Sequence, residues 1–214
     1  MGRDIFSRTL WGTRPTFFIV FTVLAVTGPL GIVIGAAAGL FGGFLDRLLM
    51  RICDIFMAFP RLILSLAIAA ALGAGIGTVI LAVSLTAWTP YARVARAETV
   101  TFRQSEFIQA ARMLGASSFQ LLWRHIMPLC VPSMIVRMAL DVPGIILVIS
   151  GLGFLGAGIR PPAPEWGAIV ADGRSVIFEA FWVSTFPGLA ILTAGLAFNI
   201  LGDALRDLLA PGDE

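Results

Sequence analysis

The sequence predicts an all-α fold, a polytopic membrane helix bundle, from its composition and its uncharged runs. Of the 214 residues, 58% are hydrophobic and only 13% are charged, whereas soluble domains carry about 25% charged residues. Several uncharged runs, such as residues 16–41, exceed the roughly 20 residues that a helix needs to cross a bilayer. One soluble core cannot hide so much apolar sequence, so we expect an integral membrane protein.

About five membrane spans are expected in order along the chain. The glycine-rich segment 73–77 breaks a long uncharged run into two helices, and segment 151–167 is rich in Gly and Pro, which predicts an extramembrane loop or a shallow re-entrant piece. The five expected spans cover residues 16–41, about 46–72, about 76 to past 91, about 129–150 and 180–202.

A polar island over residues 106–128 separates the third and fourth spans. Its sequence predicts a helix, a corner at Gly115, where glycine permits a positive φ, and a second short helix. Ser117 and Gln120 fit a capping box for that second helix, and Pro128 disfavours helix just before the next span. A mild apolar stripe at helical spacing contains Phe107, Ala111, Leu114, Ser118 and Leu121.

Two readings of this island are open on its residues alone. It could lie on the lipid surface with Arg103, Arg112 and Arg124 on the headgroups. Alternatively, it could dock into a groove of another protein. The small residues Ala110 and Ala111 at the centre of the stripe favour docking, because a lipid-bound face would rather use Leu and Phe.

The distribution of arginine predicts the orientation, because positively charged residues concentrate on the cytoplasmic side. All basic residues are Arg. Eight are expected on the side of the island and the C-terminus, which we therefore place in the cytoplasm: Arg47, Arg51, Arg93, Arg96, Arg103, Arg112, Arg124 and Arg206. The other side holds five: Arg3, Arg8, Arg14, Arg160 and Arg174. Three of these flank the first span, so we expect a further span encoded upstream of Met1.

Arg137 and Asp141 form a candidate intramembrane pair, because they are four residues apart within one expected helix. Charges at such depth are costly and commonly functional. They could mark a polar point on a translocation path or at an interface, or they could be a satisfied pair that locks helix packing. Arg61, which follows Pro60, is expected to snorkel or to cap a helix, without a transport role.

Several classes of function find no support in the sequence. Cys53 and Cys130 are far apart, and His125 is the only histidine, so neither a disulfide framework nor a metal site is expected. No Walker sequence, dinucleotide fingerprint or catalytic triad is present, which argues against nucleotide binding, a cofactor and an enzyme. The net charge of +2 is too small to indicate nucleic acid.

The island resembles the EAA loop of ABC-transporter permeases, in which E-A-A-x-x-x-G precedes I-x-L-P. Gln109, Ala110 and Ala111, then Gly115 and Pro128, stand at the matching positions. The match departs at Gln109, which replaces an acidic residue, at His125, which replaces isoleucine, and at Met127, which replaces leucine. Longer segments are similar to the dipeptide, oligopeptide and nickel branch of that family: residues 2–8, 41–60, 153–167 and 186–211.

This resemblance implies a permease subunit of an ATP-driven importer in the bacterial inner membrane, carrying peptides or a small solute such as nickel. The implied partners are a second permease, two ABC ATPases, an extracytoplasmic solute-binding protein and membrane lipid. The implied regions are an extracytoplasmic segment 1–15, a transmembrane domain 16–211 with its coupling loop at about 98–127, and a tail 212–214. The implied ATPase-coupling residues are Glu106, Gln109, Ala110, Ala111, Leu114 and Gly115.

Two other functions remain as alternatives. A truncated subunit could assemble with the same partners without transporting, and family members usually carry one more helix upstream. A stand-alone secondary transporter would be expected to show an internal repeat with matched broken helices. The sequence shows neither of these features.

Overall fold

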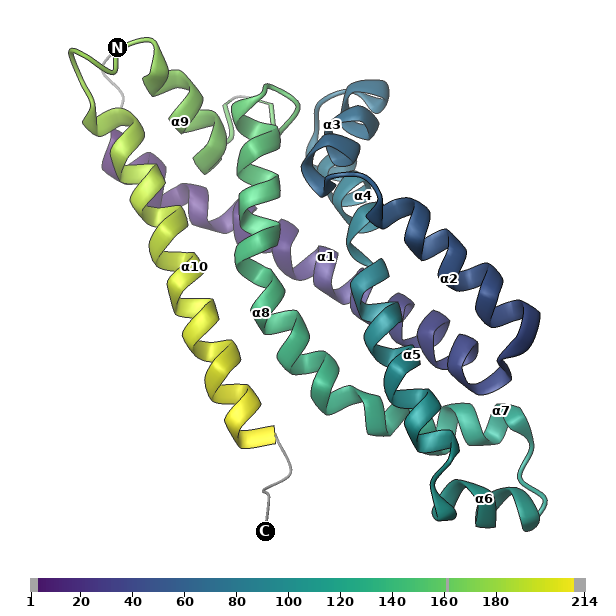
Figure 1. The fold of residues 1–214 in the computed structure, drawn as a ribbon. Coiled ribbons are helices and arrows are strands. Elements are labelled where there is room, and N and C mark those ends of the chain that lie inside the picture. Colours follow the sequence, from purple (N-terminus) through teal and green to yellow (C-terminus); the bar gives the residue numbers. More distant parts are fainter. Residues whose placement is uncertain (1–3, 161, 210–214) are drawn as a thin grey trace.

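The computed structural model describes residues 4–160 and 162–209, and all regular elements in those residues are helices (Figure 1). The expected tail 212–214 and Arg3 lie outside the described residues. The elements are α1 (Ile5–Phe41), α2 (Gly43–Met57), α3 (Arg61–Leu72), α4 (Ile76–Ala87), α5 (Thr89–Arg103), α6 (Glu106–Met113), α7 (Ser118–Gln120), the π-helix η1 (Leu121–Ile126), α8 (Met127–Phe154), α9 (Trp166–Arg174) and α10 (Trp182–Leu209).

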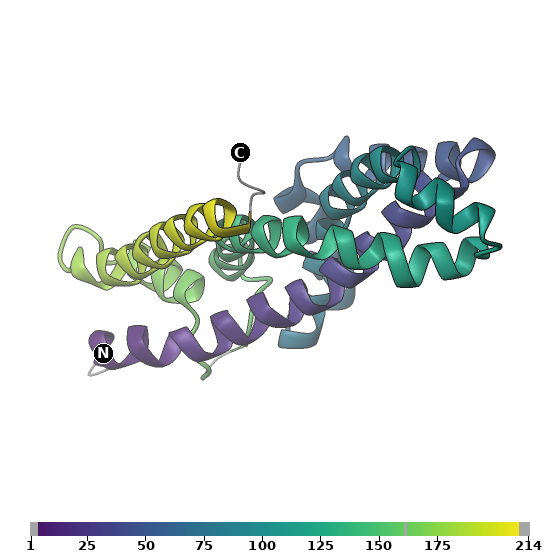
Figure 2. The ribbon, with the colours of Figure 1, turned by 90° about the horizontal axis from the view of Figure 1, so that it is seen from below.

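The core lies where α1, α4, α5 and α8 meet. Its fully buried side chains include Ile19 and Val23 of α1, Val83 of α4, Tyr91 of α5 and Ile145 of α8. Helix α10 packs beside α8, and α1 crosses next to them (Figure 2). In α10 itself only Pro187 and Gly202 are buried, so most of this helix is available to lipid or to another subunit.

The first helix begins earlier than the sequence predicts. Asp4 caps it by accepting hydrogen bonds from the backbone N–H groups of Phe6 and Ser7 at 3.0 and 3.2 Å. Most of the segment expected to precede the span therefore belongs to the same helix. Gly42, with φ of 65°, ends it and donates its N–H to the carbonyl of Ala38.

The expectation of five spans is not confirmed. Among the described residues, three helices are long and apolar enough to cross a membrane: α1, the continuous helix Ser118–Phe154, and α10. A fourth span results if α2 and α3 are counted together, although they are bent by 86°. The expected single helix 46–72 is wrong, because Pro60 lacks an N–H and disfavours helix at the residue before it.

Pro128 does not interrupt the helix, contrary to the prediction from sequence. The chain runs from η1 directly into α8, with Pro128 in the first turn of α8. A proline ring clashes with the carbonyl four residues earlier in an α-helix. The wider π-turn over Leu121–Ile126 ends two residues before this proline, which lets the helix continue without that clash.

Helices α1 and α5 share the most extensive contact in the fold. The reason is a row of glycines on α1 that brings the two backbones together. A Cβ at Gly31 would lie 2.4 Å from Cβ of Tyr91, and one at Gly35 would lie 2.1 Å from the carbonyl oxygen of Ala92. No larger residue fits at either position without moving a helix.

A buried carboxylate organises the segment after α8. Glu165 is 1% exposed and caps α9, accepting from the N–H groups of Gly167 and Ala168 at 2.8 and 2.9 Å. A Cβ at Gly153 would lie 1.8 Å from a Glu165 carboxylate oxygen, so only glycine leaves room for this carboxylate. The segment 151–167, which the sequence predicts to be a loop, is partly helical, since α8 extends to Phe154.

Glu165 should make stability depend on pH. It lies outside the three long apolar helices, and burial raises its pKa from 4.5 to about 6, although the two N–H groups oppose this rise. A carboxyl whose pKa is higher in the folded state stabilises the fold at low pH, and this contribution is lost as the pH rises through 6. The loss is about 2 kcal/mol in the free energy of unfolding.

Unfolding in detergent between pH 4.5 and 7.5 measures this effect. We expect Glu165→Gln to flatten the pH dependence, whereas Glu179→Gln, at an exposed position, leaves it as in the unmodified protein. Identical pH profiles for Glu165→Gln and the unmodified protein would contradict the assignment.

Candidate functional site

The corner between α6 and α7 is built by a hydrogen-bonded helix ending. Gly115 has φ of 88°, donates to the carbonyl of Arg112 at 3.0 Å, and is followed by Ala116, whose N–H reaches the carbonyl of Ala111 at 3.1 Å. These two bonds form a Schellman motif, in which glycine supplies the left-handed residue. The structure therefore has a positive-φ glycine at the corner that the sequence predicts.

Helix α6 is held against the rest of the chain by two apolar side chains and one aromatic contact. Ile108 is completely buried. The ring of Phe107 lies edge-on to His125 with 5.4 Å between centroids. Ala111 packs against the core beside them. Ile108 is absent from the stripe predicted from sequence, although its spacing of three from Ala111 is a helical signal.

The outward surface of the corner is apolar. Met113 is 87% exposed and Leu114 is 89% exposed. In Figures 1 and 2 this corner lies at the periphery, beyond the adjoining ends of α5 and α8. Of the candidate coupling residues, Ala111 is half-buried and the others are exposed: Glu106, Gln109, Ala110, Leu114 and Gly115. Of the stripe predicted from sequence, Ala111 packs against this chain, whereas Leu114 remains free for a contact outside it.

The second part of the island is anchored more firmly. The Ser117 hydroxyl accepts from the Gln120 N–H at 3.2 Å, which is half of the expected capping box. Leu121 and Ile126 of η1 are fully buried, while Phe119 remains 69% exposed. The corner thus combines a fixed base with an exposed apolar tip.

The expected pair of Arg137 with Asp141 is not what the structure contains. Arg61 approaches Asp141 instead, with its Nη1 3.3 Å from a carboxylate oxygen, and the hydroxyl of Tyr91 donates to Asp141 at 2.9 Å. Arg61 begins α3 at the bend after Pro60, which turns its side chain towards α8. Spacing along the sequence can indicate only neighbours on one helix, so it could not predict Arg61, which lies far from Asp141 in sequence.

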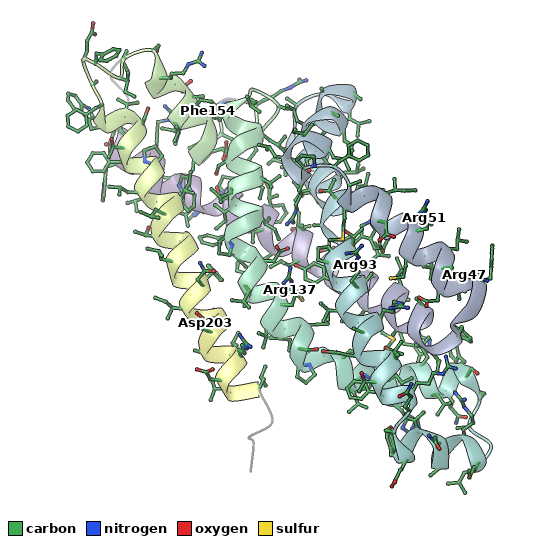
Figure 3. The ribbon with its side chains drawn as sticks, in the orientation of Figure 1. Arg47, Arg51, Arg93, Arg137, Phe154 and Asp203 are labelled. Carbon is green, nitrogen blue, oxygen red and sulfur yellow. The ribbon has the colours of Figure 1, made fainter. Side chains whose placement is uncertain are left out.

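Arg137 lies midway along α8 and is exposed (Figure 3). Within residues 4–160 and 162–209 no carboxylate lies within ion-pair distance of it. The same described residues contain no cluster of three metal-ligating side chains, and Cys53 and Cys130 are buried free thiols.

Comparison with known proteins decides the family. The model of the "Binding-protein-dependent transport system inner membrane component" family matches residues 31–212. The chain belongs to this family. The permease is 40% identical over 211 residues to the probable D,D-dipeptide transport system permease protein DdpC of Escherichia coli, covering 99% of this chain and 71% of that protein.

Other relatives are named for different solutes. The permease is 42% identical to the glutathione transport system permease protein GsiD of Pectobacterium atrosepticum, covering 99% and 70% of the two chains. It is 41% identical to the nickel transport system permease protein NikC of Escherichia coli, covering 99% and 76%. Its fold matches an inward-facing structure of the MetNI methionine ABC transporter with a TM-score of 0.80, 17% identity and coverage of 99% and 100%.

Proposed function

We propose that this ABC permease carries a peptide or a related small solute across the inner membrane and receives the ATPase motion through α6. The observation that carries the coupling role is the exposed apolar tip, Met113 and Leu114, on a hydrogen-bonded glycine corner. Exposed apolar side chains on a fixed turn fit a protein groove, because their burial releases water without ordering a flexible loop. The candidate contact is therefore α6 with its corner.

The remaining partners follow from the family. Its description names binding-protein-dependent transport, so we propose an extracytoplasmic solute-binding protein, a second permease subunit and two ATPase subunits as partners. Relatives named for dipeptides, glutathione and nickel support a transporting subunit over one that only assembles. The proposed orientation places α6 and the C-terminal end of α10 in the cytoplasm, and Figure 1 draws both at one end of the molecule.

A charge placed on the tip should break the contact with the ATPase. We expect Leu114→Glu to weaken copurification of a co-expressed ATPase subunit about tenfold or more, because a buried central contact commonly contributes that much to binding. The subunit itself should stay folded in the membrane, since Leu114 is almost fully exposed.

Phe178→Glu is the matched control, because Phe178 is also fully exposed but lies in the segment before α10. We expect this control to retain the ATPase. Equal recovery of the ATPase with Leu114→Glu and with the unmodified permease would refute the coupling role of the corner.

A further inference from the structure

A cavity of about 510 Å³ lies between α5, α8 and α10. Its size is typical of small-molecule sites. Helix α5 lines it with Val94, Glu98 and Phe102, which are spaced by four residues and therefore share one face. Most of its wall is apolar, and its charged side chains are Glu98, Arg137 and Arg206. None of these three side chains belongs to the coupling corner.

Each end of the cavity offers unsatisfied charge. One carboxylate oxygen of Glu98 is buried and has no hydrogen-bond partner among the described residues. Glu98 also lines the cavity, and the negative charge of its carboxylate there favours a cationic ligand that donates hydrogen bonds. Arg137 carries its charge in the middle of an apolar helix, and such arginines face a water-filled cavity or a partner rather than lipid.

The two arginines lie at one level. Gly202 of α10 packs against Leu140 of α8, because a Cβ at Gly202 would lie 2.5 Å from the Leu140 side chain. The two helices run in opposite directions (Figure 1). Four residues beyond Gly202, Arg206 therefore lies level with Val136 and next to Arg137. Two neighbouring guanidinium groups favour a carboxylate, which each of them can bind with two hydrogen bonds.

Glu98 lies at the other end. The hydroxyl of Thr99 is 3.9 Å from the sulfur of Cys130, which places Glu98 near the level of Cys130 on α8. Arg137 follows Cys130 by seven positions, which corresponds to about 10 Å along a helix. An extended tripeptide covers about 10 Å. The acid and the two bases are thus separated by the length of a short peptide.

We propose that this cavity binds a short zwitterionic peptide, with its ammonium group at Glu98 and its carboxylate between Arg137 and Arg206. The assignment as a station of the transport path rests on the proposed function. The three charged groups all belong to this chain, so the binding can be measured on this chain alone. The apolar walls then contact the side chains of the peptide, which leaves the charged termini as the recognised groups.

Binding of Ala-Leu-Ala to the permease in phosphatidylcholine nanodiscs tests the proposal, with dissociation constants measured by saturation-transfer NMR. The N-acetylated peptide and the C-terminal amide serve as probes for the two ends. We expect the free peptide to bind about tenfold more tightly than either capped form, because each cap removes one charge-assisted contact.

The variants should separate the two ends. Glu98→Gln should lose the preference over the N-acetylated peptide and keep the preference over the amide, and Arg137→Gln should do the reverse. Asp203→Asn and Arg51→Gln are matched controls outside the cavity and should keep both preferences (Figure 3). Glu98→Gln keeps the size of the side chain and Arg137 is exposed, so both variants are expected to fold.

Three results would overturn the proposal. The first is no binding at millimolar peptide, and the second is equal affinity for the free and capped peptides. The third is an equal loss of affinity for all three peptides in both variants. Displacement of the peptide by phosphatidylglycerol would assign the cavity to an anionic lipid instead. Loss of the ATPase in the Leu114→Glu experiment reports on the coupling corner, so failure of the cavity proposal and failure of the proposed function are distinguishable.

Discussion

Gly115→Arg is expected to abolish solute uptake while the subunit remains in the membrane. The φ of 88° at Gly115 is a left-handed conformation, which costs a residue with a side chain roughly 1–2 kcal/mol. Space is not the obstacle, since a Cβ there meets nothing within 4 Å. The strain instead favours unwinding of the corner, which would displace Leu114 from its docking position. Uptake of labelled solute by the assembled transporter measures the effect.

Gly156→Arg is the control for backbone strain. Gly156 has a φ of 79° and equally open surroundings, but it lies in the loop after α8. We expect this variant to retain uptake, and Gly115→Asn to retain more uptake than Gly115→Arg, because Asn adopts the left-handed region more readily. Normal uptake by Gly115→Arg would show that the corner is not the coupling element.

Asp141→Asn is expected to lower the free energy of unfolding by several kcal/mol. The side chains of Arg61 and Asp141 are only 24% and 14% exposed, so removal of the carboxylate leaves a largely buried guanidinium without its partner. Breaking one half of a buried pair costs about 3–5 kcal/mol. Arg61→Gln should destabilise the fold for the same reason. The double variant should recover part of the loss. Unfolding by a denaturing detergent gives these energies.

Arg137→Gln distinguishes this pair from the one predicted by sequence. In a double-mutant cycle, Arg61 and Asp141 should show a coupling energy, whereas changes at Arg137 and Asp141 should be nearly additive. Additive losses for Arg61 with Asp141 would show that their contact contributes no stability.

Membrane class and most helix positions could be predicted from the sequence, because both depend on local composition. The long apolar run of α1 and the break at residues 73–75 are features of this kind. Proline was harder to interpret. The chain bends at Pro60 because proline disfavours helix at the residue before it, whereas at Pro128 the preceding π-turn avoids the clash. One residue type thus had opposite effects in two contexts.

The candidate site was predictable in its sequence position but not in its orientation. Gly115 signals a corner through its lack of a Cβ. Whether Phe107 or Ile108 faces inward depends on where α5 and η1 lie, and this is a tertiary property. The partner of Asp141 was missed for the same reason, since Arg61 reaches it only through the bend between α2 and α3.

The close packing of α1 on α5 has a mechanical consequence. Because backbone lies on backbone at Gly35, the two helices cannot slide past each other without a large displacement, and we expect them to move as one rigid unit. Helix α6 follows α5 after two residues, so a force that a partner applied to α6 would be transmitted to the end of this unit. The 37 residues of α1 extend it for about 55 Å. We expect the chain to flex instead at the bend between α2 and α3, where it already turns by 86°.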